Sequence, residues 1–372
     1  MKIVVDARTA TSHFPGIGRY ISNLLMAITD LQDEMPLHII RSPAPINYRI
    51  ASNLRETISD TPVFSLRQQW VIPKLINKIG GSLYHSTYYL MPYLVKVPVV
   101  FTCYDLIPIV YPQYFNPLQR IIYRTAHRIA ARVSSSIIAI SESTKTDLTK
   151  YFSIDEQKIS AIPLAADKTF NPQPRDAIEV ARNRYNLPHR YCLYVGTNKP
   201  HKNLLGLLSA WKFLHDKKAL EGHSLVIAGY WDPRYPEAKE FTMASGLNKV
   251  VSFTGKVNEE DLPALYSGAT VFVQPSLYEG FGLPIIEAMA CGTAVTCSNT
   301  SSLPEVAGDA ASLFDPRDTK SIAATLGTLL ADSSMLGALR EKGIRQASTF
   351  SWKKTALNTI DIYRKVYDAR KV

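Results

Sequence analysis

Two glutamates near the start of a predicted helix are the residues with the clearest chemistry. Glu279 lies in the loop after an apolar run at 271–274, and Glu287 lies about one turn into a helix predicted over 283–290. Carboxylates accept paired hydrogen bonds from neighbouring hydroxyls, such as those of a sugar or a ribose. The alternative is that Glu279 caps the helix and Glu287 is a solvated surface charge. The apolar composition of the rest of this helix favours the ligand-facing interpretation.

The loop between the two glutamates allows a ligand to approach the backbone closely. Gly280 and Gly282 carry no side chains, so their backbone N–H groups are accessible. Pro284 sits in the first turn of the predicted helix, where its missing N–H costs no hydrogen bond. Backbone amides and the positive end of a helix attract phosphate or polarised sugar hydroxyls. The segment therefore predicts a binding site for such groups.

A lysine follows a second predicted strand. Lys202 lies in the stretch 196–204, after an apolar run at 191–195 and at the mouth of a helix predicted over 204–215. An ammonium group there can neutralise a diphosphate that gains charge as it leaves a sugar. The alternative is a solvated lysine at the start of a helix.

Small and polar residues also follow two strands of the first half. Gly16 and Gly18 lie between a predicted strand at 3–5 and a helix predicted over 18–29, where a glycine pair often only makes a tight turn. The third glycine and the downstream acid of a dinucleotide fingerprint are missing, which disfavours hydride transfer. Tyr104 and Asp105 directly follow a predicted strand. Tyr104 is either a ligand-facing residue or an aromatic residue of the core.

Short apolar runs alternate with helical patterns along the chain. The predicted strands fall in two series, 3–5, 37–40, 97–103, 137–140 and 159–162, then 191–195, 225–228, 250–253, 271–274 and 294–297. Helices are predicted over 18–29, 118–133, 204–215 and 283–290. This alternation predicts parallel sheets covered on both faces. Two such series predict an α/β chain of two Rossmann-like, doubly wound domains.

The boundary between the two domains is expected in a proline-rich stretch. Pro163, Pro172, Pro174 and Pro188 punctuate a polar segment before the second strand series begins. We place the first domain at 1–170 and the second at 171–351. Helical spacing returns after Trp352 and continues to the end of the chain, at about 352–372.

Composition excludes several classes of protein. The 372 residues are 46% apolar and 20% charged, which is too apolar for a disordered chain. A net charge of +10 suits nucleic acid, anionic lipid or a phosphorylated small molecule. We find no recognition-helix, RNP or zinc motif, so nucleic acid is disfavoured as a partner.

The cysteines and the apolar runs indicate a reducing compartment. Cys103, Cys192, Cys291 and Cys297 form no CxxC pair and no zinc-spaced cluster, so we expect buried free thiols. Asp6 precedes any signal-peptide stretch, and no run approaches the roughly 18 apolar residues of a membrane span. We therefore expect a soluble, cytoplasmic chain.

Four arginines recur at every fourth position of one predicted helix. Arg120, Arg124, Arg128 and Arg132 form a slanting stripe, because a helix has about 3.6 residues per turn. One interpretation is a solvated face. The other is peripheral contact with anionic lipid headgroups or with a pyrophosphate-linked acceptor.

A set of motifs, in order along the chain, resembles retaining glycosyltransferase family 4. The paired Glu279 and Glu287, the segment 298–310 and the tripeptide Gly255-Lys256-Val257 carry the resemblance, and Gly196-Thr197 is similar to a mannosyltransferase-like subgroup. The family implies a GT-B architecture, in which two Rossmann-like domains face each other across a cleft. It also implies a C-terminal helix that crosses back to the first domain.

The resemblance implies roles for individual residues. Glu287 would bind the donor ribose, Glu279 the hydroxyls of the transferred sugar and Lys202 the diphosphate. The remaining donor-binding residues implied are Gly16, Gly18, Gly196, Thr197, Lys256, Val257, Gly280, Phe281, Gly282 and Leu283. The catalytic residues implied are Glu279, Lys202, Tyr104 and Asp105, with Asp105 near the acceptor or orienting its neighbours.

This chain departs from the family pattern at two of these positions. Tyr104 stands where the family usually has a donor-contacting histidine, and Thr197 stands where many members have an arginine. One cation for the leaving group is therefore unassigned, and Arg19 or Lys199 are its candidates.

The resemblance implies a retaining hexosyltransferase that moves a sugar to a hydroxyl of a glycan or glycolipid, giving an α-linkage in polysaccharide biosynthesis. The subgroup pattern makes GDP-mannose the first donor expected, with UDP-glucose or another UDP-hexose next. No cofactor and no metal is expected, because we see no acidic cluster suited to Mg²⁺. The alternatives are a nucleotide-sugar epimerase, a phosphorylase or a non-catalytic nucleotide-sugar-binding subunit.

Overall fold

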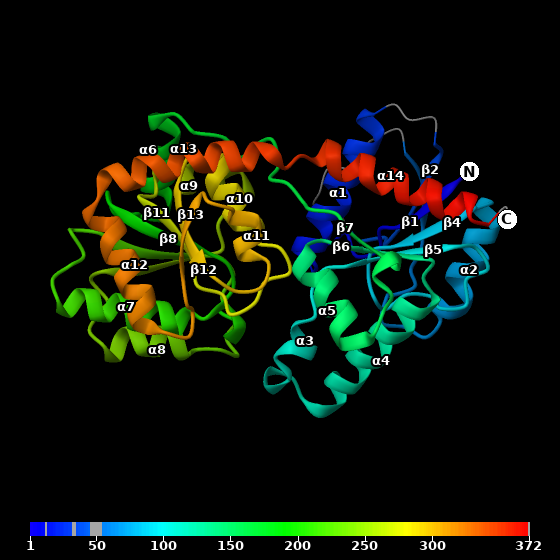
Figure 1. Cartoon of the computed structure of the whole chain (residues 1–372), viewed down its shortest axis with the longest axis horizontal. Coiled ribbons are helices and arrows are strands. Elements are labelled where there is room, and N and C mark those ends of the chain that lie inside the picture. Colours follow the sequence, from blue (N-terminus) through cyan, green and yellow to red (C-terminus); the bar gives the residue numbers. More distant parts are fainter. Residues whose placement is uncertain (12, 32–34, 45–53, 371–372) are drawn as a thin grey trace. The chain divides into compact units, whose positions relative to one another are not determined.

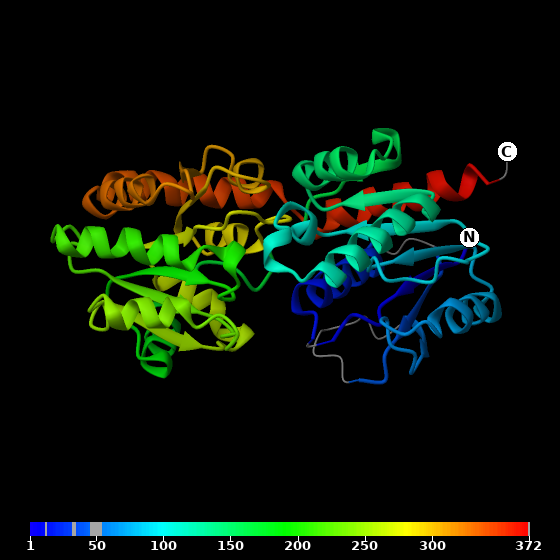
Figure 2. The same cartoon turned by 90° about the horizontal axis from the view of Figure 1, so that it is seen from below.

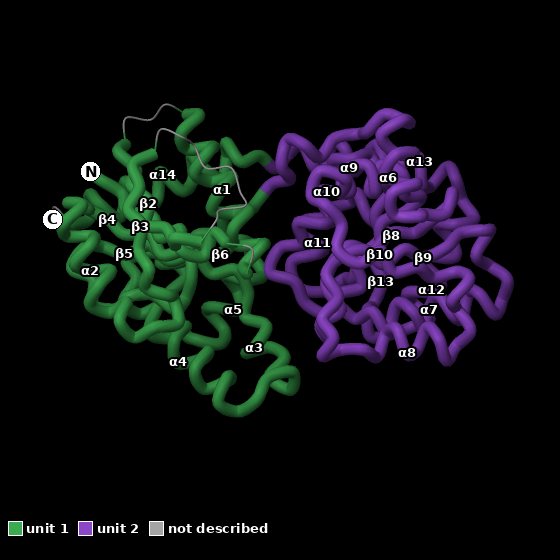
Figure 3. Tube along the Cα trace, turned by 180° about the vertical axis from the view of Figure 1, so that it is seen from behind, with its two compact units in different colours: residues 1–164, 351–372 green, residues 165–350 purple. Residues whose placement is uncertain are grey.

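The computed structural model describes every residue except 12, 32–34, 45–53 and 371–372. It divides into two compact units: unit 1 comprises Met1–Leu164 with Ser351–Val372, and unit 2 comprises Ala165–Phe350 (Figure 3). The division falls six residues before the boundary expected between 170 and 171, and Phe170 already packs with unit 2, where its ring meets Tyr266 edge to face at 6.0 Å. The second unit ends at Phe350 where the sequence analysis has 351.

Unit 1 is built on a seven-stranded, wholly parallel sheet. Its strands are β1 (Ile3–Asp6), β2 (Leu37–Arg41), β3 (Arg55–Ile58), β4 (Leu83–Ser86), β5 (Val99–Cys103), β6 (Ser136–Ala139) and β7 (Ile159–Ala161). They are ordered β3-β2-β1-β4-β5-β6-β7. The order reverses between β1 and β4, so the loops after these two strands diverge at the carboxyl edge of the sheet.

Helices cover both faces of this sheet. They are α1 (Pro15–Asp30), α2 (Gln68–Ile79), α3 (Ile107–Val110), α4 (Pro117–Val133), α5 (Glu142–Phe152) and α14 (Trp352–Asp368). Side chains of α2, α4 and α5 form one core with alternate residues of the strands, such as Val4, Tyr84 and Phe101. Helices α1 and α14 pack together on the other face (Figure 1).

Unit 2 repeats the arrangement with a six-stranded parallel sheet. Its strands are β8 (Tyr191–Val195), β9 (Ser224–Ala228), β10 (Val251–Gly255), β11 (Val271–Gln274), β12 (Ala294–Ser298) and β13 (Ala311–Phe314). They are ordered β10-β9-β8-β11-β12-β13, and the order reverses between β8 and β11. These strands are almost continuously apolar because both faces of the sheet are covered.

The helices of unit 2 also lie on both sides of its sheet (Figure 2). They are α6 (Arg175–Tyr185), α7 (Leu204–Asp216), α8 (Glu237–Ala244), α9 (Leu262–Gly268), α10 (Leu283–Ala290), α11 (Leu303–Ala307), α12 (Thr319–Ala331) and α13 (Ser333–Thr349). Helices α7 and α12 share one core with the sheet, and α10 and α13 pack together. The expectation of two doubly wound α/β domains is confirmed.

The last helix is fastened to unit 1 by a buried polar contact. The Tyr363 hydroxyl lies 2.6 Å from Nδ1 of His85 in β4, and Nε2 of His85 lies 2.8 Å from the Thr102 hydroxyl in β5. Thr355 also donates to the Pro163 carbonyl oxygen at 2.7 Å. The helix ends at Asp368, and residues 371–372 of the predicted segment lie outside the described part.

Three strands and one helix start differ from the sequence analysis. The strands β3, β4 and β13 were not predicted, since each has four residues and includes polar side chains. Helix α1 begins at Pro15 rather than at residue 18, with Pro15 in its first turn. In the described part of the chain, no single helix has the length and apolar character to cross a membrane, and one bent pair, 319–331 with 333–368, meets those two criteria only jointly.

Buried histidines predict that unit 1 loses stability in mild acid. Burial lowers the pKa of His85 from 6.5 to about 3. Between these values the unfolded chain binds a proton that the folded chain does not, so stability falls as the pH falls through this window. From pH 7 to pH 5 one such histidine costs about 2 kcal/mol.

Urea unfolding at pH 7 and at pH 5 tests whether the free energy of unfolding falls with pH. His85→Gln should weaken the protein at pH 7 but reduce the further loss on going to pH 5. The exposed His13 of the same unit is the control, and His13→Gln should leave the pH dependence unchanged. An identical loss in the wild-type protein and in His85→Gln would contradict the assignment.

Candidate functional site

The predicted lysine and the first predicted glutamate meet at the point where the strand order of unit 2 reverses. Lys202 ends a short 3₁₀ helix (Pro200–Lys202) that follows β8, and Glu279 lies in the loop between β11 and α10. Strands β8 and β11 are parallel neighbours, so their carboxyl ends deliver both side chains to one edge of the sheet. Ligands of doubly wound sheets bind at such an edge.

Glu279 is buried in a dense set of donors. Lys202 Nζ lies 2.7 and 2.8 Å from its two carboxylate oxygens. The side-chain amide of Gln274 donates to Oε1 at 2.7 Å, and the Ser276 hydroxyl donates to the same oxygen at 2.6 Å. Burial alone would raise the pKa of Glu279, but the Lys202 ammonium and these hydrogen bonds hold it below its usual value. The carboxylate is therefore charged at neutral pH.

Serines of the next loop fix the backbone around Glu279. The Glu279 N–H donates to the Ser301 hydroxyl at 2.8 Å. The Ser302 hydroxyl donates to the carbonyl oxygens of Glu279 at 2.9 Å and of Phe281 at 2.8 Å. Sequence reasoning did not single out these serines or Gln274, although Ser301 and Ser302 stand in the segment that carries the family resemblance.

Helix α10 starts as its glycine and proline predict. Gly282 precedes the helix with a φ of +108°, and Pro284 lies in the first turn. A Cβ at Gly282 would lie 2.8 Å from Leu303 Cδ2, so both conformation and space require glycine. Phe281 is buried against Phe350, while Gly280 and Leu283 are partly exposed.

Glu287 is buried inside unit 2 and is not a surface charge. It lies on α10, and the Tyr266 hydroxyl donates to its Oε2 at 3.1 Å. A carboxylate buried among apolar residues of a helix needs such a partner. The solvated-charge alternative considered for Glu287 is therefore wrong.

A pocket lies at the ends of β8, β9 and β10, and Gly196 is the predicted donor-binding residue in its lining. Gly196, Gly229 and Gly255 lie at the carboxyl ends of these neighbouring strands and all contribute to the lining. A Cβ at Gly229 would lie 2.1 Å from the Gly196 carbonyl oxygen, so the two loops touch through bare backbone. Lys256 is exposed and Val257 is buried, and the pocket lining includes neither residue.

Aromatic rings and a lysine form the opposite part of this pocket. Trp231 and Phe253 meet edge to face at 5.4 Å, and Lys239 Nζ lies 4.5 Å from the Trp231 ring centre. Asn198 holds the loop that carries Trp231, because its side chain accepts from the Asp232 N–H at 2.7 Å and donates to the Asp232 carbonyl oxygen at 2.8 Å. Sequence reasoning missed these residues. The signals in the sequence were weak, since Trp231 stands three residues after one predicted strand and Phe253 is the last residue of another.

The residues predicted around Gly196 hold local structure. The Thr197 carbonyl oxygen accepts from the Tyr194 hydroxyl at 2.7 Å, and the Gly196 N–H donates to the Ala228 carbonyl oxygen at 2.9 Å. A Cβ at Gly196 would lie 2.6 Å from the Tyr194 hydroxyl. This loop is shaped by its own side chains before any ligand arrives.

The glycine pair of unit 1 does not form the tight turn considered for it. Gly16 and Gly18 both lie in the first turn of α1, with Gly16 exposed and Gly18 buried. A Cβ at Gly16 would meet nothing within 4 Å. The space beside the helix start is therefore open.

Tyr104 and Asp105 follow β5 as predicted. The Tyr104 hydroxyl is buried and has no hydrogen-bond partner among the residues that the structure describes, and its ring meets Tyr20 edge to face at 5.4 Å. The Asp105 carboxylate accepts from the Ile107 N–H at 3.0 Å and so fixes the start of α3. A buried hydroxyl without a partner costs stability.

The predicted arginines lie on the exposed face of α4, together with apolar side chains. The exposed arginines are Arg120, Arg124, Arg128 and Arg132. The exposed apolar residues of the helix are Leu118, Ile121, Ile122, Ile129 and Val133. The helix contains no Asp or Glu. We call these nine residues the α4 face.

Two further sequence expectations concern cysteines and metals. The four cysteines are buried and form no disulfide, which confirms the expectation for them. Within the described ranges, no group of three or more His, Cys, Asp or Glu is placed to hold a metal ion.

Two protein families match consecutive parts of the chain. Residues 16–170 match the family described as Glycosyltransferase Family 4, and residues 178–346 match the family described as Glycosyl transferases group 1. Nearly all of unit 1 before α14 and nearly all of unit 2 are therefore covered.

Individual relatives and a solved structure show the same likeness. The chain is 32% identical over 302 residues to O-antigen chain mannosyltransferase B of Escherichia coli, covering 80% of this chain and 77% of that protein. It is 29% identical over 349 residues to the serotype-specific mannosyltransferase WbdA of Escherichia coli, covering 90% of this chain but only 42% of that protein. Sucrose-phosphate synthase from Thermosynechococcus elongatus has a similar fold, with a TM-score of 0.83 at 21% identity over 99% of this chain and 100% of that one.

Proposed function

The chain belongs to the family 4 glycosyltransferases, and on that premise we propose that it transfers mannose from GDP-mannose to a hydroxyl of a glycan or glycolipid. The anomeric configuration of the donor is retained, so the product is α-linked. The two relatives named as mannosyltransferases support mannose as the sugar. The arrangement of Lys202 and Glu279 at the strand reversal of unit 2 carries the proposal.

The donor diphosphate can replace Glu279 as the partner of the Lys202 ammonium group. Before the donor binds, Lys202 and Glu279 neutralise each other, which a buried charge needs. A diphosphate carries more negative charge than one carboxylate and competes for the ammonium group. Glu279 then turns its acceptor oxygens to the sugar hydroxyls. Binding of diphosphate and of sugar are thus coupled through one pair of side chains.

The transfer step follows from these positions. The bond between C1 of mannose and the diphosphate oxygen breaks, and the acceptor oxygen bonds to C1 on the same face. The acceptor proton goes to an oxygen of the leaving diphosphate. Lys202 stabilises the charge that develops on the diphosphate, and Glu279 holds the sugar in place. The chain supplies positioning and electrostatics, and no covalent nucleophile is needed.

The nucleotide base is proposed to lie against the open side of the pocket at the ends of β8, β9 and β10, whose enclosed volume of about 20 Å³ is smaller than a base. Bare backbone at Gly196 and Gly229 lets a flat ligand lie against the sheet edge. The Trp231 and Phe253 rings with the Lys239 ammonium suit a polar heteroaromatic ring. Glu287 in turn accepts from the ribose hydroxyls, with Tyr266 holding its second oxygen.

The α4 face supports a peripheral position on an anionic membrane, on the cytoplasmic side. Exposed apolar side chains beside arginines, on a helix without acids, match the interface between headgroups and acyl chains. Basic residues near an anionic surface each contribute about 1 kcal/mol. A membrane contact of unit 1 would bring the enzyme to a lipid-linked acceptor.

The donor prediction concerns thermal stability. A ligand that binds only the folded protein stabilises it by about 2.7 kcal/mol at one hundred times its dissociation constant. GDP-mannose should therefore raise the melting temperature more than UDP-glucose at equal concentration. A larger shift with UDP-glucose would contradict the donor assignment, and no shift with either would contradict nucleotide-sugar binding.

The second prediction concerns Glu279. Glu279→Gln keeps the size of the side chain but removes the charge that pairs with Lys202 and the strong acceptor for the sugar. Transfer from GDP-mannose to a mannose oligosaccharide should fall at least about 100-fold. The exposed Glu237 on α8 provides the matched control, since Glu237→Gln changes charge equally and should leave the rate unchanged. Full turnover by a folded Glu279→Gln protein would remove Glu279 from the mechanism.

The membrane prediction uses charge reversal. The double variant Arg124→Glu, Arg128→Glu should lower binding to phosphatidylglycerol vesicles at least about 30-fold at low salt, measured by sedimentation. Reversal of two exposed basic residues of unit 2, Arg175→Glu with Lys249→Glu, changes net charge equally and should not reduce binding. An equal loss of vesicle binding in both double variants, or no vesicle binding by the wild-type protein, would refute the proposal that the α4 face contacts the membrane.

A further inference from the structure

Three aromatic rings from three different loops meet in unit 1. The ring centres of Phe14 and Tyr88 lie 5.3 Å apart, those of Phe14 and Phe64 lie 6.1 Å apart, and those of Phe64 and Tyr88 lie 6.3 Å apart. Phe64 is 60% exposed, and the other two rings are partly exposed. We call this triangle of rings the aromatic platform. It is too exposed to belong to the core.

The platform lies at the edge of the sheet where ligands of doubly wound domains bind. Phe14 follows β1, Phe64 follows β3 and Tyr88 follows β4, so all three loops leave the carboxyl ends of strands. The strand order reverses between β1 and β4. This is the unit 1 counterpart of the position that Lys202 and Glu279 occupy in unit 2.

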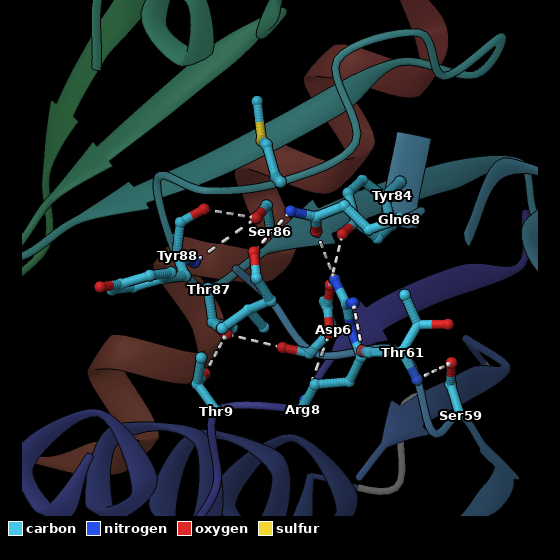
Figure 4. A network of polar contacts seen from close by, with 12 residues as sticks. Asp6, Arg8, Thr9, Ser59, Thr61, Gln68, Tyr84, Ser86, Thr87 and Tyr88 are labelled. Carbon is cyan, nitrogen blue, oxygen red and sulfur yellow. Dashed lines mark hydrogen bonds and ion pairs between the residues drawn. The ribbon is translucent and has the colours of Figure 1, made fainter. Parts of the chain in front are cut away.

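A buried ion pair between Arg8 and Asp6 fixes two of the three loops, and Figure 4 shows it together with Tyr88. The Arg8 guanidinium pairs with the Asp6 carboxylate at 2.6 and 2.8 Å. The same guanidinium donates to the Thr61 carbonyl oxygen at 3.0 Å and to the Gln68 side chain at 3.0 Å. The loop that carries Phe64 runs between Thr61 and Gln68 and is thus tied to the end of β1.

The third loop is tied to the same place. The Thr87 hydroxyl donates to the Asp6 carbonyl oxygen at 2.6 Å and lies 3.2 Å from the Thr9 hydroxyl. The Ser86 hydroxyl donates to the Tyr88 carbonyl oxygen at 2.7 Å. Polar side chains that are themselves buried therefore hold exposed rings in one arrangement. Such preorganised support is typical of a binding site.

We propose that the aromatic platform binds a sugar ring of the acceptor glycan, an inference that rests on the proposed function. One face of a pyranose presents C–H groups that pack on an aromatic ring, while its hydroxyls point outward to water and polar rim groups. The donor groups gather at the strand reversal of unit 2, which leaves the equivalent edge of unit 1 for the second substrate.

The charge around the platform selects a neutral sugar over a phosphate group. Phe14, Phe64 and Tyr88 carry no positive charge, and a phosphate site would need a cation or several free amides. The guanidinium of Arg8 is committed to Asp6, Thr61 and Gln68, and its side chain is only 2% exposed. Arg8 is therefore not available to a free phosphate or a pyrophosphate-linked lipid headgroup. The side chain that contacts the platform from the same loop as Phe14 is the His13 imidazole, whose ring centre lies 4.6 Å from that of Phe14.

The test compares two exposed side chains of one loop. Phe64→Ala removes a ring of the platform, and Leu66→Ala removes an apolar side chain that is 78% exposed. The probe is a mannotriose, with its KM measured in transfer assays and its binding measured by saturation-transfer NMR. Phe64→Ala should raise the acceptor KM about tenfold and weaken the NMR signal, with the GDP-mannose thermal shift unchanged. Leu66→Ala should match the wild-type protein, and Phe64→Trp should restore acceptor binding.

The outcomes separate this inference from the proposed function. An unchanged acceptor KM and an unchanged NMR signal for Phe64→Ala would overturn the proposal that the platform binds the acceptor. Mannose transfer by the same protein would leave the proposed function intact. Equal effects of Phe64→Ala and Leu66→Ala would also overturn it. A wild-type protein that transfers no sugar would contradict the proposed function, and the NMR comparison would still decide whether the platform binds a saccharide.

Discussion

The contact between Lys202 and Glu279 is the constraint around which unit 2 is organised. Two opposite charges are removed from most of the solvent, so each needs the other, and both loops must hold them within hydrogen-bond distance. Ser276, Ser301 and Ser302 maintain the glutamate side of the pair. Gly282, with a φ of +108°, then starts α10 directly after this loop.

Unit 1 also has an ion pair at its strand reversal, but this pair is more deeply buried than the one in unit 2. Arg8 and Asp6 also form an ion pair at a strand reversal, but the arginine side chain is 2% exposed and its other donors are occupied. The Lys202 side chain is 20% exposed, and its ammonium contacts one exchangeable carboxylate. The buried pair of unit 1 supports loops, whereas the more accessible pair of unit 2 can change partners when an anion arrives.

The two departures from the family pattern, Tyr104 and Thr197, can be interpreted through their hydrogen bonds. Tyr104 carries a buried hydroxyl that has no partner in the described part of the chain, so a polar group of a ligand would satisfy it. The Thr197 carbonyl oxygen accepts from Tyr194 and shapes the loop through its backbone. The substitution of histidine by Tyr104 thus preserves a hydrogen-bonding group, while the position of Thr197 contributes main-chain geometry rather than charge.

The sequence by itself determined the two doubly wound sheets, because few other folds accommodate apolar runs that alternate with helical patterns. It also indicated Lys202, Glu279 and Glu287 as site residues, because these charged residues follow strands or stand inside an apolar helix. It missed β4, whose His85 and Ser86 look polar but are buried by neighbours far along the chain. Only the tertiary structure decided that Lys202 and Glu279 touch, that Glu287 is buried, and that Phe14, Phe64 and Tyr88 converge. Local pattern reports which faces avoid water, whereas contacts between loops depend on strand order, which no local pattern encodes.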